Sequence, residues 1–488
     1  MTRSISDSTP SGTSHRLRPR RTKIIATIGP ACDAPEIIEE MIRAGMNVAR
    51  LNLSHGSFSE HAERIRRLRA AAAQAGAFTA ILVDTKGSEI RTGILHGGKA
   101  ELAAGGSFEL YYQPRTGDAS GVSVSNANLG DAVRSGDSVL LDDGTIELQV
   151  QSAGRESVRC AIIRGGVLRD SKGVNLPDSD LQFSAEDRLT REEIAFAVEH
   201  EVDYIAASFV HDKKDIDAIR AILDELGAEI PVVAKIENRA AVANLDSIVD
   251  AANGTMVARG DLGVEFPLAE VPAIQKIVIR TTVTNGKPVI TATQMLDSME
   301  RNSRPTRAEV SDVANAILDG SSAVMLSGET AMGRYPVESV RTMSALAVRA
   351  EASLKEFGQL QKILPNPSNV ITEAVSQAAM AMADHLNAAA IISLTETGFT
   401  SRLISKYRPD CPIIAVTTSV EVMRRFSMNW GVHALHYTGK ASDQDKVQFA
   451  IRKAKKLGWV QVGDIVVATS GQALQAGSTN LIRVVVVE

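Results

Sequence analysis

Short apolar runs rich in β-branched residues alternate with helical stretches along the chain from residue 22 onward. Polar residues are scarce inside these runs, which is typical of parallel strands buried on both faces. The stretches between them, such as 35–44 and 59–75, place charged residues on one helical face. The runs cover residues 23–29, 47–52, 80–86, 204–210, 231–237, 255–261, 288–294 and 323–327. Eight strands, most of them followed by a helix, predict an α/β fold built on a (β/α)₈ TIM barrel.

The positions of the polar residues favour this barrel over the alternative, an open doubly wound sheet. Charged, amide and hydroxyl side chains gather where the apolar runs end. They are Arg50, Asn52, Asp84, Lys86, Ser208, Lys235, Glu237, Asp261, Thr293, Gln294, Ser327 and Glu329. In a barrel the carboxyl ends of the strands converge on one rim, where active sites form. An open sheet would spread the same residues along a line.

Two further domains are expected besides the barrel, which takes residues 22–87 and 173–356. Residues 88–172 change to short alternating strands, with a hairpin signal at Asp142, Asp143 and Gly144. We predict a small β-barrel domain there, inserted after the third barrel strand as a lid. Residues 357–488 begin with a linker that contains two prolines and predict an α/β regulatory domain. Its expected strands are 389–394, 412–416, 464–469 and 481–487.

Composition removes several classes of function. The chain has 53 basic and 58 acidic residues, a net charge of −5, so no basic field marks nucleic acid as a partner. No apolar run approaches the ~18 residues of a membrane span. Three separated cysteines form neither a disulfide framework nor a zinc motif, which suits a reducing cytoplasm. Residues 1–21 lack an apolar helical face, so a disordered tail is preferred to a transit peptide.

The segment 233–238 (VAKIEN) carries the first candidate chemistry. Lys235 and Glu237 share a strand face, and a plain salt bridge is one interpretation of that pair. Asp261, at the end of the next run, adds a second hard oxygen ligand, and Gly260 lets a ligand approach the backbone. Two carboxylates with open positions suit Mg²⁺, and a neighbouring Lys suits a developing negative charge. The pattern indicates a site for an anionic, oxygen-rich substrate.

The second and third runs end in a different mixture. Arg50 has the forked guanidinium that suits phosphate. Asn52 and Ser54 on the same face, with Asp84 and Thr85, offer neutral oxygens and one carboxylate, which would suit a monovalent cation. Residues of these types at strand ends also cap helices, and that alternative stays open.

Thr293 supplies a further rim hydroxyl, and three catalytic motifs are absent from the sequence. Thr293 ends its run on the rim, although packing alone explains many threonines in strands. The sequence contains no Walker or kinase Gly-rich phosphate loop and no Gly-x-Ser-x-Gly elbow. ATP chemistry of the Walker type is therefore excluded.

Several long motifs follow one another along the chain. They are 22–31 (TKIIATIGPA), 49–56 (ARLNLSHG), 84–93 (DTKGSEIRTG), 172–177 (KGVNLP), 234–238 (AKIEN), 258–265 (ARGDLGVE), 292–296 (ATQML) and 325–330 (MLSGET). Through these motifs, in this order, the chain resembles the pyruvate kinases from about residue 22 to its end. The resemblance implies transfer of the phosphoryl group of phosphoenolpyruvate to ADP, giving pyruvate and ATP, with Mg²⁺ (or Mn²⁺) and K⁺.

The resemblance also assigns roles at the rim. Glu237 and Asp261 would hold Mg²⁺, and Lys235 would stabilise both the phosphoryl group in flight and the enolate left behind. Arg50 would grip the phosphoryl group. The carboxylate side of the substrate would meet backbone and hydroxyl groups, those of Gly260, Asp261 and Thr293.

Two further ligand sets are carried over by the same resemblance. K⁺ would be bound by Asn52, Ser54, Asp84 and Thr85. The nucleotide would face His55, Arg91 and Lys172, the last two from the hinges of the inserted domain. Family members with Glu at the position of Glu89 tend to need K⁺. Ser88 stands where the family usually has Pro, which implies a more flexible hinge.

An effector site is expected in the C-terminal domain. A Gly and several hydroxyls precede the helix patterned over 402–406, a natural phosphate site, and this segment resembles the family's effector loop. Its residues are Thr395, Thr397, Gly398, Thr400 and Ser401. A plain helix cap is the alternative. The later loop 471–478 lacks the Trp and Arg of members activated by fructose-1,6-bisphosphate, so AMP or a sugar monophosphate is preferred. The family is commonly homotetrameric.

Two other functions compete with this interpretation. A metal-dependent aldolase or lyase on a similar barrel also holds an enolate, but it needs neither the inserted domain nor the K⁺ cluster. A regulatory binding protein that has lost the reaction would usually have lost a site residue as well. The chain retains Lys235, Glu237, Asp261, Arg50 and Thr293.

Overall fold

The computed structural model describes residues 18–87, 90–125, 129–178, 191–358, 370–439, 442–471 and 479–488. Residues 1–17 of the predicted tail (1–21), most of the linker, Ser88, Glu89 and residues 472–478 lie outside these ranges. The chain divides into two compact units. The larger spans Thr22–Leu364 and takes in the short segment Arg424–Trp430 from late in the sequence.

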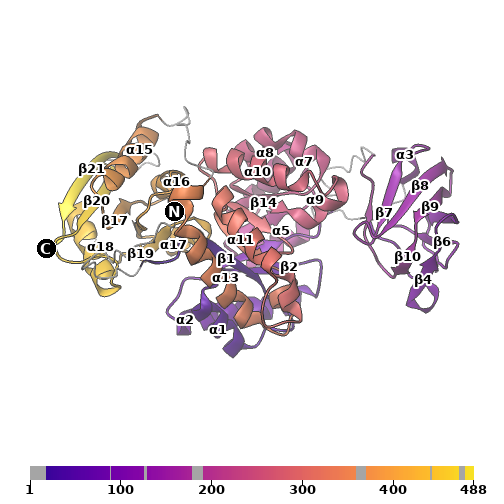
Figure 1. Cartoon of the computed structure of the whole chain (residues 1–488), viewed down its shortest axis with the longest axis horizontal. Coiled ribbons are helices and arrows are strands. Elements are labelled where there is room, and N and C mark those ends of the chain that lie inside the picture. Colours follow the sequence, from indigo (N-terminus) through magenta and orange to yellow (C-terminus); the bar gives the residue numbers. More distant parts are fainter. Residues whose placement is uncertain are drawn as a thin grey trace, which may run out of the picture. The chain divides into compact units, whose positions relative to one another are not determined.

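A closed barrel of eight parallel strands forms the centre of the larger unit, as predicted (Figure 1). Its strands are β1 (Lys23–Thr27), β2 (Val48–Asn52), β3 (Ala80–Asp84), β12 (Tyr204–Ala207), β13 (Val232–Ile236), β14 (Gly254–Ala258), β15 (Val289–Ala292) and β16 (Ala323–Leu326). They follow one another around the barrel in sequence order, and β16 closes on β1. Each lies inside one of the expected apolar runs except β14, which begins one residue before its run, at Gly254.

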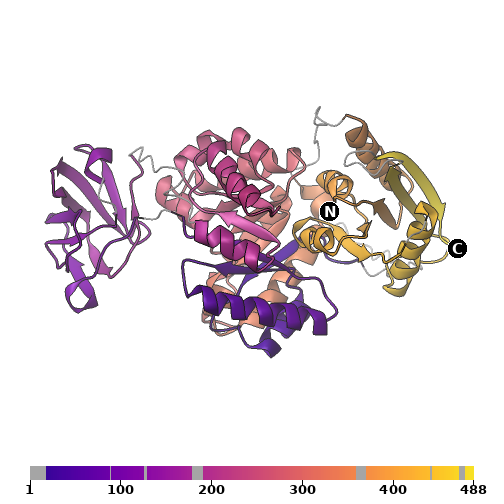
Figure 2. The same cartoon turned by 180° about the vertical axis from the view of Figure 1, so that it is seen from behind.

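Helices surround these strands on both sides shown in Figures 1 and 2. They are α1 (Pro35–Ala44), α2 (Phe58–Gln74), α5 (Arg191–Glu199), α6 (Lys213–Glu225), α7 (Arg239–Ala243), α8 (Leu245–Ala251), α9 (Arg259–Glu265), α10 (Val271–Thr284), α11 (Arg307–Asp319), α12 (Gly328–Ala331), α13 (Pro336–Glu351) and α14 (Leu354–Phe357), with the 3₁₀ turn η2 (Asp297–Glu300). Several begin at capping boxes, as where Ser57 and Glu60 satisfy each other's backbone N–H groups at the start of α2.

The strands bury both faces in two separate apolar layers. Val48, Ala80, Leu82 and Val233 belong to the interior cluster, which consists of strand residues and Met428. Their sequence neighbours pack outward against the helices. This alternation decides which polar residues enter the barrel, because residues two apart in a strand share a face.

The insertion between β3 and α5 is all-β, as predicted. Its elements are β4 (Lys99–Leu102), β5 (Ser107–Tyr111), β6 (Gly121–Ser123), β7 (Ser138–Leu141), β8 (Ile146–Ala153), β9 (Ser157–Arg164), β10 (Gly166–Arg169) and β11 (Val174–Asn175), with η1 (His96–Gly98) and α3 (Leu129–Ala132). The expected hairpin joins β7 to β8, and Asp142, Asp143 and Gly144 have φ of 51°, 54° and 75°. Among the described residues the named strands form a six-stranded sheet, with β11 and β6 at its two ends, and a β4–β10 pair. Bridges of Arg91 to Gly173 beside β11 and of Thr92 to Val124 beside β6 connect these two ends, in keeping with the predicted β-barrel.

The smaller unit is the expected α/β domain, with one strand more than predicted. Its sheet has the order β19 (Val432–His436), β18 (Ile413–Thr417), β17 (Ala390–Leu394), β20 (Ile465–Gly471) and β21 (Thr479–Val486). The helices are α15 (Val370–His385), α16 (Phe399–Lys406), most of α17 (Val420–Arg425) and α18 (Asp443–Lys456). The turn η4 (Phe426–Met428), which follows α17, belongs to the larger unit. β21 is antiparallel to β20 and forms an edge. Strand β19 was missed because two His residues interrupt its apolar pattern.

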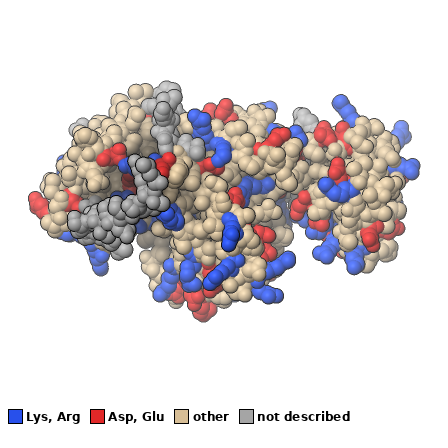
Figure 3. Space-filling model, in the orientation of Figure 1, with Lys and Arg blue, Asp and Glu red and all other residues tan. Residues whose placement is uncertain are grey.

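Basic and acidic side chains are interspersed over the face drawn in Figure 3. Among the described helices, none combines the length and the apolar character that crossing a bilayer requires.

Candidate functional site

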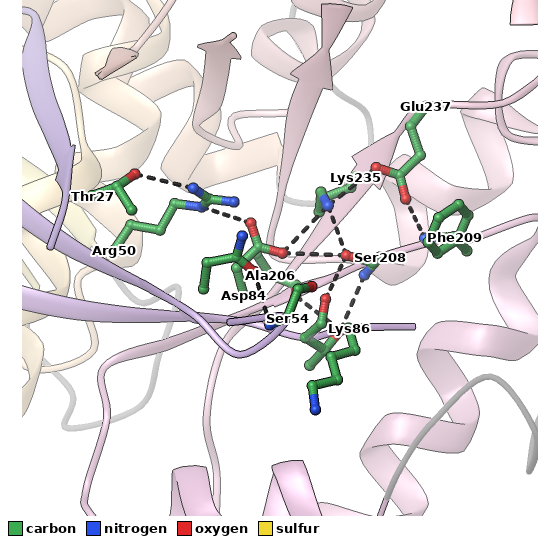
Figure 4. Close-up of polar contacts among 12 residues, drawn as sticks. Thr27, Arg50, Ser54, Asp84, Lys86, Ala206, Ser208, Phe209, Lys235 and Glu237 are labelled. Atoms are coloured by element: carbon green, nitrogen blue, oxygen red, sulfur yellow. Dashed lines mark hydrogen bonds and ion pairs between the residues drawn. The ribbon is translucent and has the colours of Figure 1, made fainter. Parts of the chain in front are cut away.

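The carboxylate of Asp84 lies at the centre of the rim cluster, at the end of β3 (Figure 4). Nε of Arg50 donates to its Oδ2 at 2.7 Å. Nζ of Lys235 lies 3.3 Å from Oδ1, and the hydroxyl of Ser208 lies 3.2 Å from the same oxygen. Asp84 is only 1% exposed, and these two cations and the hydroxyl compensate its buried charge.

Lys235 links this carboxylate to a second one. Its Nζ donates to the hydroxyl of Ser208 at 2.7 Å and lies 3.2 Å from Oε2 of Glu237. The other carboxylate oxygen of Glu237 accepts from the backbone N–H of Phe209. The predicted pair is therefore one edge of a network that also includes Asp84, not an isolated salt bridge.

Strand alternation explains why these side chains meet. Val48, Ala80 and Val233 pack inside the barrel. Residues at even spacing from them must face inward too, which brings Arg50, Asp84 and Lys235 to the rim. Ala49, Ile81 and Ala234 between them pack outward, so a shift of one residue would bury every charge in the helix layer.

The rim shifts the pKa values of its titratable groups. Burial by itself raises the pKa of Asp84, but the charges of Lys235 and Arg50 outweigh it and the net pKa is lowered. Burial opposes the charge of Lys235, yet Asp84, Glu237 and Asp261 raise its pKa above the ordinary value. Lys235 therefore stays protonated near neutral pH.

The pKa values of Glu237 and Asp261 are raised, whereas that of Asp84 is lowered. These two carboxylates could hold a divalent cation. Burial, and then mutual repulsion, raises the pKa of Glu237 to about 7, although Lys235 lowers it. Burial also raises the pKa of Asp261. A buried carboxylate and a partly buried one that repel each other are a donor set whose repulsion Mg²⁺ would relieve, so these residues fit the ion. Among the described residues, no cluster of three or more His, Cys, Asp and Glu side chains forms a metal site.

A second part of the rim joins the predicted residues Gly260 and Thr293. The hydroxyl of Thr293 accepts from the N–H of Gly260 at 2.8 Å and donates to the carbonyl of Ala292 at 2.7 Å. Thr293 and Gln294 have φ of 68° and 52°, an uncommon conformation for residues with a side chain. A strained turn therefore positions this hydroxyl, rather than ordinary strand packing.

The residues of the predicted K⁺ site have partners within the barrel. Oδ1 of Asn52 accepts from the N–H of Ser54 at 3.1 Å. The hydroxyl of Thr85 lies 3.3 Å from the carbonyl of Ala206 and accepts from the N–H of Ser208 at 3.2 Å. These residues surround Asp84, but their binding of K⁺ stays a prediction.

The predicted nucleotide residues lie on two parts of the larger unit. The carbonyl of His55, after β2, is bonded to the His61 ring at 2.8 Å. Within the insertion, Nη1 of Arg91 donates to the carbonyl of Ser171 at 2.8 Å, and Nζ of Lys172 lies 2.8 Å from Oδ1 of Asp142. The approach of the last two side chains to a nucleotide stays a prediction.

The predicted effector residues form a compact turn before α16. The hydroxyl of Thr395 accepts from the N–H of Gly398 at 2.9 Å, and Gly398 has φ of 80°. The carbonyl of Thr397 accepts from Arg402. Thr400 and Ser401 are buried, with hydroxyls 2.5 Å from Thr479 and 3.0 Å from Ser393. The last two hydroxyls therefore support the turn and are not exposed to a ligand.

Three residues of the rim, Thr27, Ser208 and Arg259, were given no role in the site by the sequence analysis. Nη1 of Arg50 donates to the hydroxyl of Thr27 at 3.0 Å, and Ser208 connects Lys235 to Asp84. Arg259 binds the turn at Thr293. Thr27, Ser208 and Arg259 all lie at or directly after strand ends, which was the available signal. For Arg259 that position does not show that the side chain binds the turn at Thr293.

The closed barrel and this rim define a TIM-barrel enzyme with a site for an anionic substrate. The family model described as "Pyruvate kinase, barrel domain" matches residues 19–340, and "Pyruvate kinase, alpha/beta domain" matches 373–485. Pyruvate kinases of Sporosarcina psychrophila and Geobacillus stearothermophilus are 45% identical over 472 residues, 96% of this chain and 80% of each relative. That of Clostridium acetobutylicum is 43% identical, over 96% of this chain and 100% of its own length.

The chain belongs to the pyruvate kinase family, and it is a phosphotransferase. This result sets aside the lyase and the binding protein as alternatives. The motifs on which the sequence resemblance rested include the strand ends that build the rim.

Proposed function

We propose that the rim cluster transfers the phosphoryl group of phosphoenolpyruvate to ADP, with Mg²⁺ (or Mn²⁺) and K⁺ as cofactors. The observation that carries this proposal is the position of Lys235 between Asp84 and Glu237, with Arg50 on the other side of Asp84. Two cations fixed by one buried carboxylate suit a phosphoryl group whose charge is spread over its oxygens.

Each rim residue has a part in this transfer. An ADP oxygen attacks phosphorus, the bond from phosphorus to the enol oxygen breaks, and its electron pair stays on that oxygen. Lys235, protonated and fixed, stabilises the phosphoryl group and then the enolate. Arg50 uses Nε and Nη1 to bind Asp84 and Thr27, and its Nη2 would face a phosphoryl oxygen. Mg²⁺, held by Glu237 and Asp261, would supply Lewis-acid charge to the substrate oxygens.

The reaction ends when carbon 3 of enolpyruvate takes a proton and the enolate oxygen becomes the ketone. We assign Thr293 to this side of the substrate, where its hydroxyl would bind the carboxylate and orient a water that delivers the proton. The Gly260 N–H, which Thr293 now occupies, would be shared with that carboxylate. Holding these groups in place before the reaction is the enzyme's main contribution.

Formation of ATP and pyruvate from phosphoenolpyruvate, ADP and Mg²⁺, measured with and without K⁺, tests the proposal. Activity that rises strongly with K⁺ would support both the transfer and the site at Asn52, Ser54, Asp84 and Thr85. Activity indifferent to K⁺ would remove the monovalent site alone. Folded protein without either product would reject the proposed function.

Regulation by a phosphorylated effector is a further part of the proposal. The left-handed Gly398 and the N-terminus of α16, which has no side-chain cap, support a phosphate site. AMP or a sugar monophosphate is preferred to fructose-1,6-bisphosphate as the effector. Titration of each candidate at sub-saturating phosphoenolpyruvate tests this. Activation by the bisphosphate alone would contradict it.

Assembly into a homotetramer in the cytoplasm is proposed from the family. Its structural support is the edge strand β21, where Leu481, Val484 and Val486 are exposed apolar residues. Light scattering on the purified chain would measure the mass, and Val484→Glu should reduce it if β21 lies in a contact. A monomeric wild-type chain would contradict the proposal.

A further inference from the structure

Arg259 lies beside the proposed site but makes its contacts away from the cation cluster. It begins α9, directly before Gly260, and its side chain is 13% exposed. Nε donates to the carbonyl of Ala292 at 3.2 Å, and Nη2 donates to the carbonyl of Thr293 at 2.6 Å. Nη2 also lies 2.8 Å from the sulfur of Met295.

The guanidinium is held on its other side by α11. Its Nη1 donates to Oδ2 of Asp312 at 2.6 Å. A planar guanidinium with its donors in a fixed fork reaches all these acceptors at once, and a lysine ammonium has no such geometry. Arg259 therefore connects helix α11 to two consecutive carbonyls of the rim.

Those two carbonyls belong to the residue before the strained turn, Ala292, and to its first residue, Thr293. Thr293 and Gln294 both have positive φ, and such conformations persist where the surroundings over-determine them. The turn places the Thr293 hydroxyl at the N–H of Gly260. Gly260 is the next residue after Arg259, so one side chain fixes both the turn and its distance from the helix that carries Gly260.

We infer that Arg259 is a positioning residue for the reaction and acts through Thr293. The inference rests on the proposed role of Thr293. Arg259 touches no reacting atom in this account. It keeps the hydroxyl where the substrate carboxylate and the proton-delivering water need it. Asp312 contributes to the same positioning because it binds and orients the guanidinium of Arg259.

Arg69 offers a matched control with a similar set of partners. Its guanidinium lies 3.0 Å from Oδ2 of Asp203 and 3.0 Å from the carbonyl of Glu201. Asp203 directly precedes β12, so this arginine serves the opposite ends of the barrel strands. Arg69→Lys reports what loss of a forked arginine does to stability alone.

The experiment is a double-mutant cycle with Arg259→Lys, Thr293→Ala and the double variant. We expect Arg259→Lys to lower kcat by about 10²-fold, as misplacement of a reacting group by ~1 Å does. In the Thr293→Ala background the same change should lower kcat by less than about 2-fold, because residues that act as one unit are not additive. Asp312→Asn, a milder change, should lower kcat in the same Thr293-dependent way.

A second readout separates positioning from folding. Exchange of the methyl protons of pyruvate in D₂O, followed by NMR, reports the proton-transfer half of the reaction without phosphoryl transfer. Arg259→Lys should slow this exchange, and Arg69→Lys should leave both exchange and kcat unchanged while lowering Tm.

Three results would overturn the inference in different ways. Independent, multiplicative effects of Arg259→Lys and Thr293→Ala would show that Arg259 does not act through Thr293. If Arg259→Lys behaves like Arg69→Lys, with a lower Tm and full kcat, Arg259 stabilises the fold and does not position Thr293 for the reaction. Full kcat in Thr293→Ala would remove the proposed role of Thr293, and the inference with it, while leaving the transferase activity intact.

Discussion

Nζ of Lys235 lies 3.3 Å from Oδ1 of Asp84, and this contact joins β13 to β3 although β12 stands between them in the barrel. Ser208, which follows β12, fills the gap with a hydroxyl bonded to Lys235. Asp84 also accepts from Arg50, so one buried carboxylate holds both cations of the rim. The charges proposed to meet the phosphoryl group are thus fixed before substrate arrives.

Asp84→Asn should therefore weaken both the fold and the reaction. The change leaves two partly buried cations, Arg50 and Lys235, without their shared buried counter-charge, and breaking such a group destabilises by about 3 kcal/mol. Urea unfolding followed by circular dichroism would measure this loss. The exposed pair of Asp217 with Lys213 supplies the control, because Asp217→Asn should change stability by less than about 1 kcal/mol. Equal stability of both variants would contradict the role given to Asp84.

Lys235→Met should abolish most of the catalytic rate without loss of the metal site. Removing one preorganised charge that faces the transition state lowers kcat by about 10²- to 10³-fold. Binding of Mn²⁺ should not weaken, because the change removes a positive charge beside Glu237. Steady-state kinetics and Mn²⁺ titration measure the two effects. Lys276→Met, which breaks an ion pair to Asp319 between α10 and α11, should keep full kcat. A Lys235→Met enzyme with full kcat would rule out the proposed mechanism.

The sequence predicted the barrel better than the other parts because both faces of its strands are buried. Burial on two sides leaves continuous apolar runs, and a polar residue at the end of such a run stands out. Lys235, Glu237 and Asp84 were recognisable for this reason. Strand β19 has partly buried side chains and two His residues, so no such contrast exists there.

Other features depend on contacts between distant segments. The role of Arg259 requires the left-handed turn at Thr293, and no local pattern shows that a Thr will adopt positive φ. Thr27 is an ordinary strand Thr until Arg50 is placed beside it. The bridges of Arg91 to Gly173 and of Thr92 to Val124, which connect the two ends of the inserted sheet, also join residues far apart in the sequence.

The cysteine thiols should be unreactive in the folded chain. Burial raises the pKa of Cys32 to about 11 and those of Cys160 and Cys411 to about 12. A raised pKa lowers the thiolate fraction at any pH below it, and the thiolate is the reactive form. A disulfide reagent at about pH 8 should label the native chain slowly and all three thiols after unfolding. Rapid labelling of the native chain would contradict their burial.

Gly260→Ala should leave the fold intact and weaken phosphoenolpyruvate binding. A Cβ at this position would lie 3.7 Å from the Thr293 side chain, an ordinary contact that requires no rearrangement. The added methyl group would nevertheless occupy space beside the N–H and hydroxyl proposed to bind the substrate carboxylate. One methyl group in a binding site changes specificity by about 10- to 200-fold, so we expect KM for phosphoenolpyruvate to rise by at least about 10-fold.

The matched control for this change lies on the same helix. Gly263→Ala places a Cβ against the flexible side chain of Leu268 only. It should leave KM for phosphoenolpyruvate and Tm close to those of the wild type. Steady-state kinetics at saturating ADP would compare the two variants, with thermal melting as the test of folding. If Gly260→Ala binds phosphoenolpyruvate as well as Gly263→Ala does, the substrate carboxylate lies elsewhere on the rim and the assignment of Thr293 must move with it.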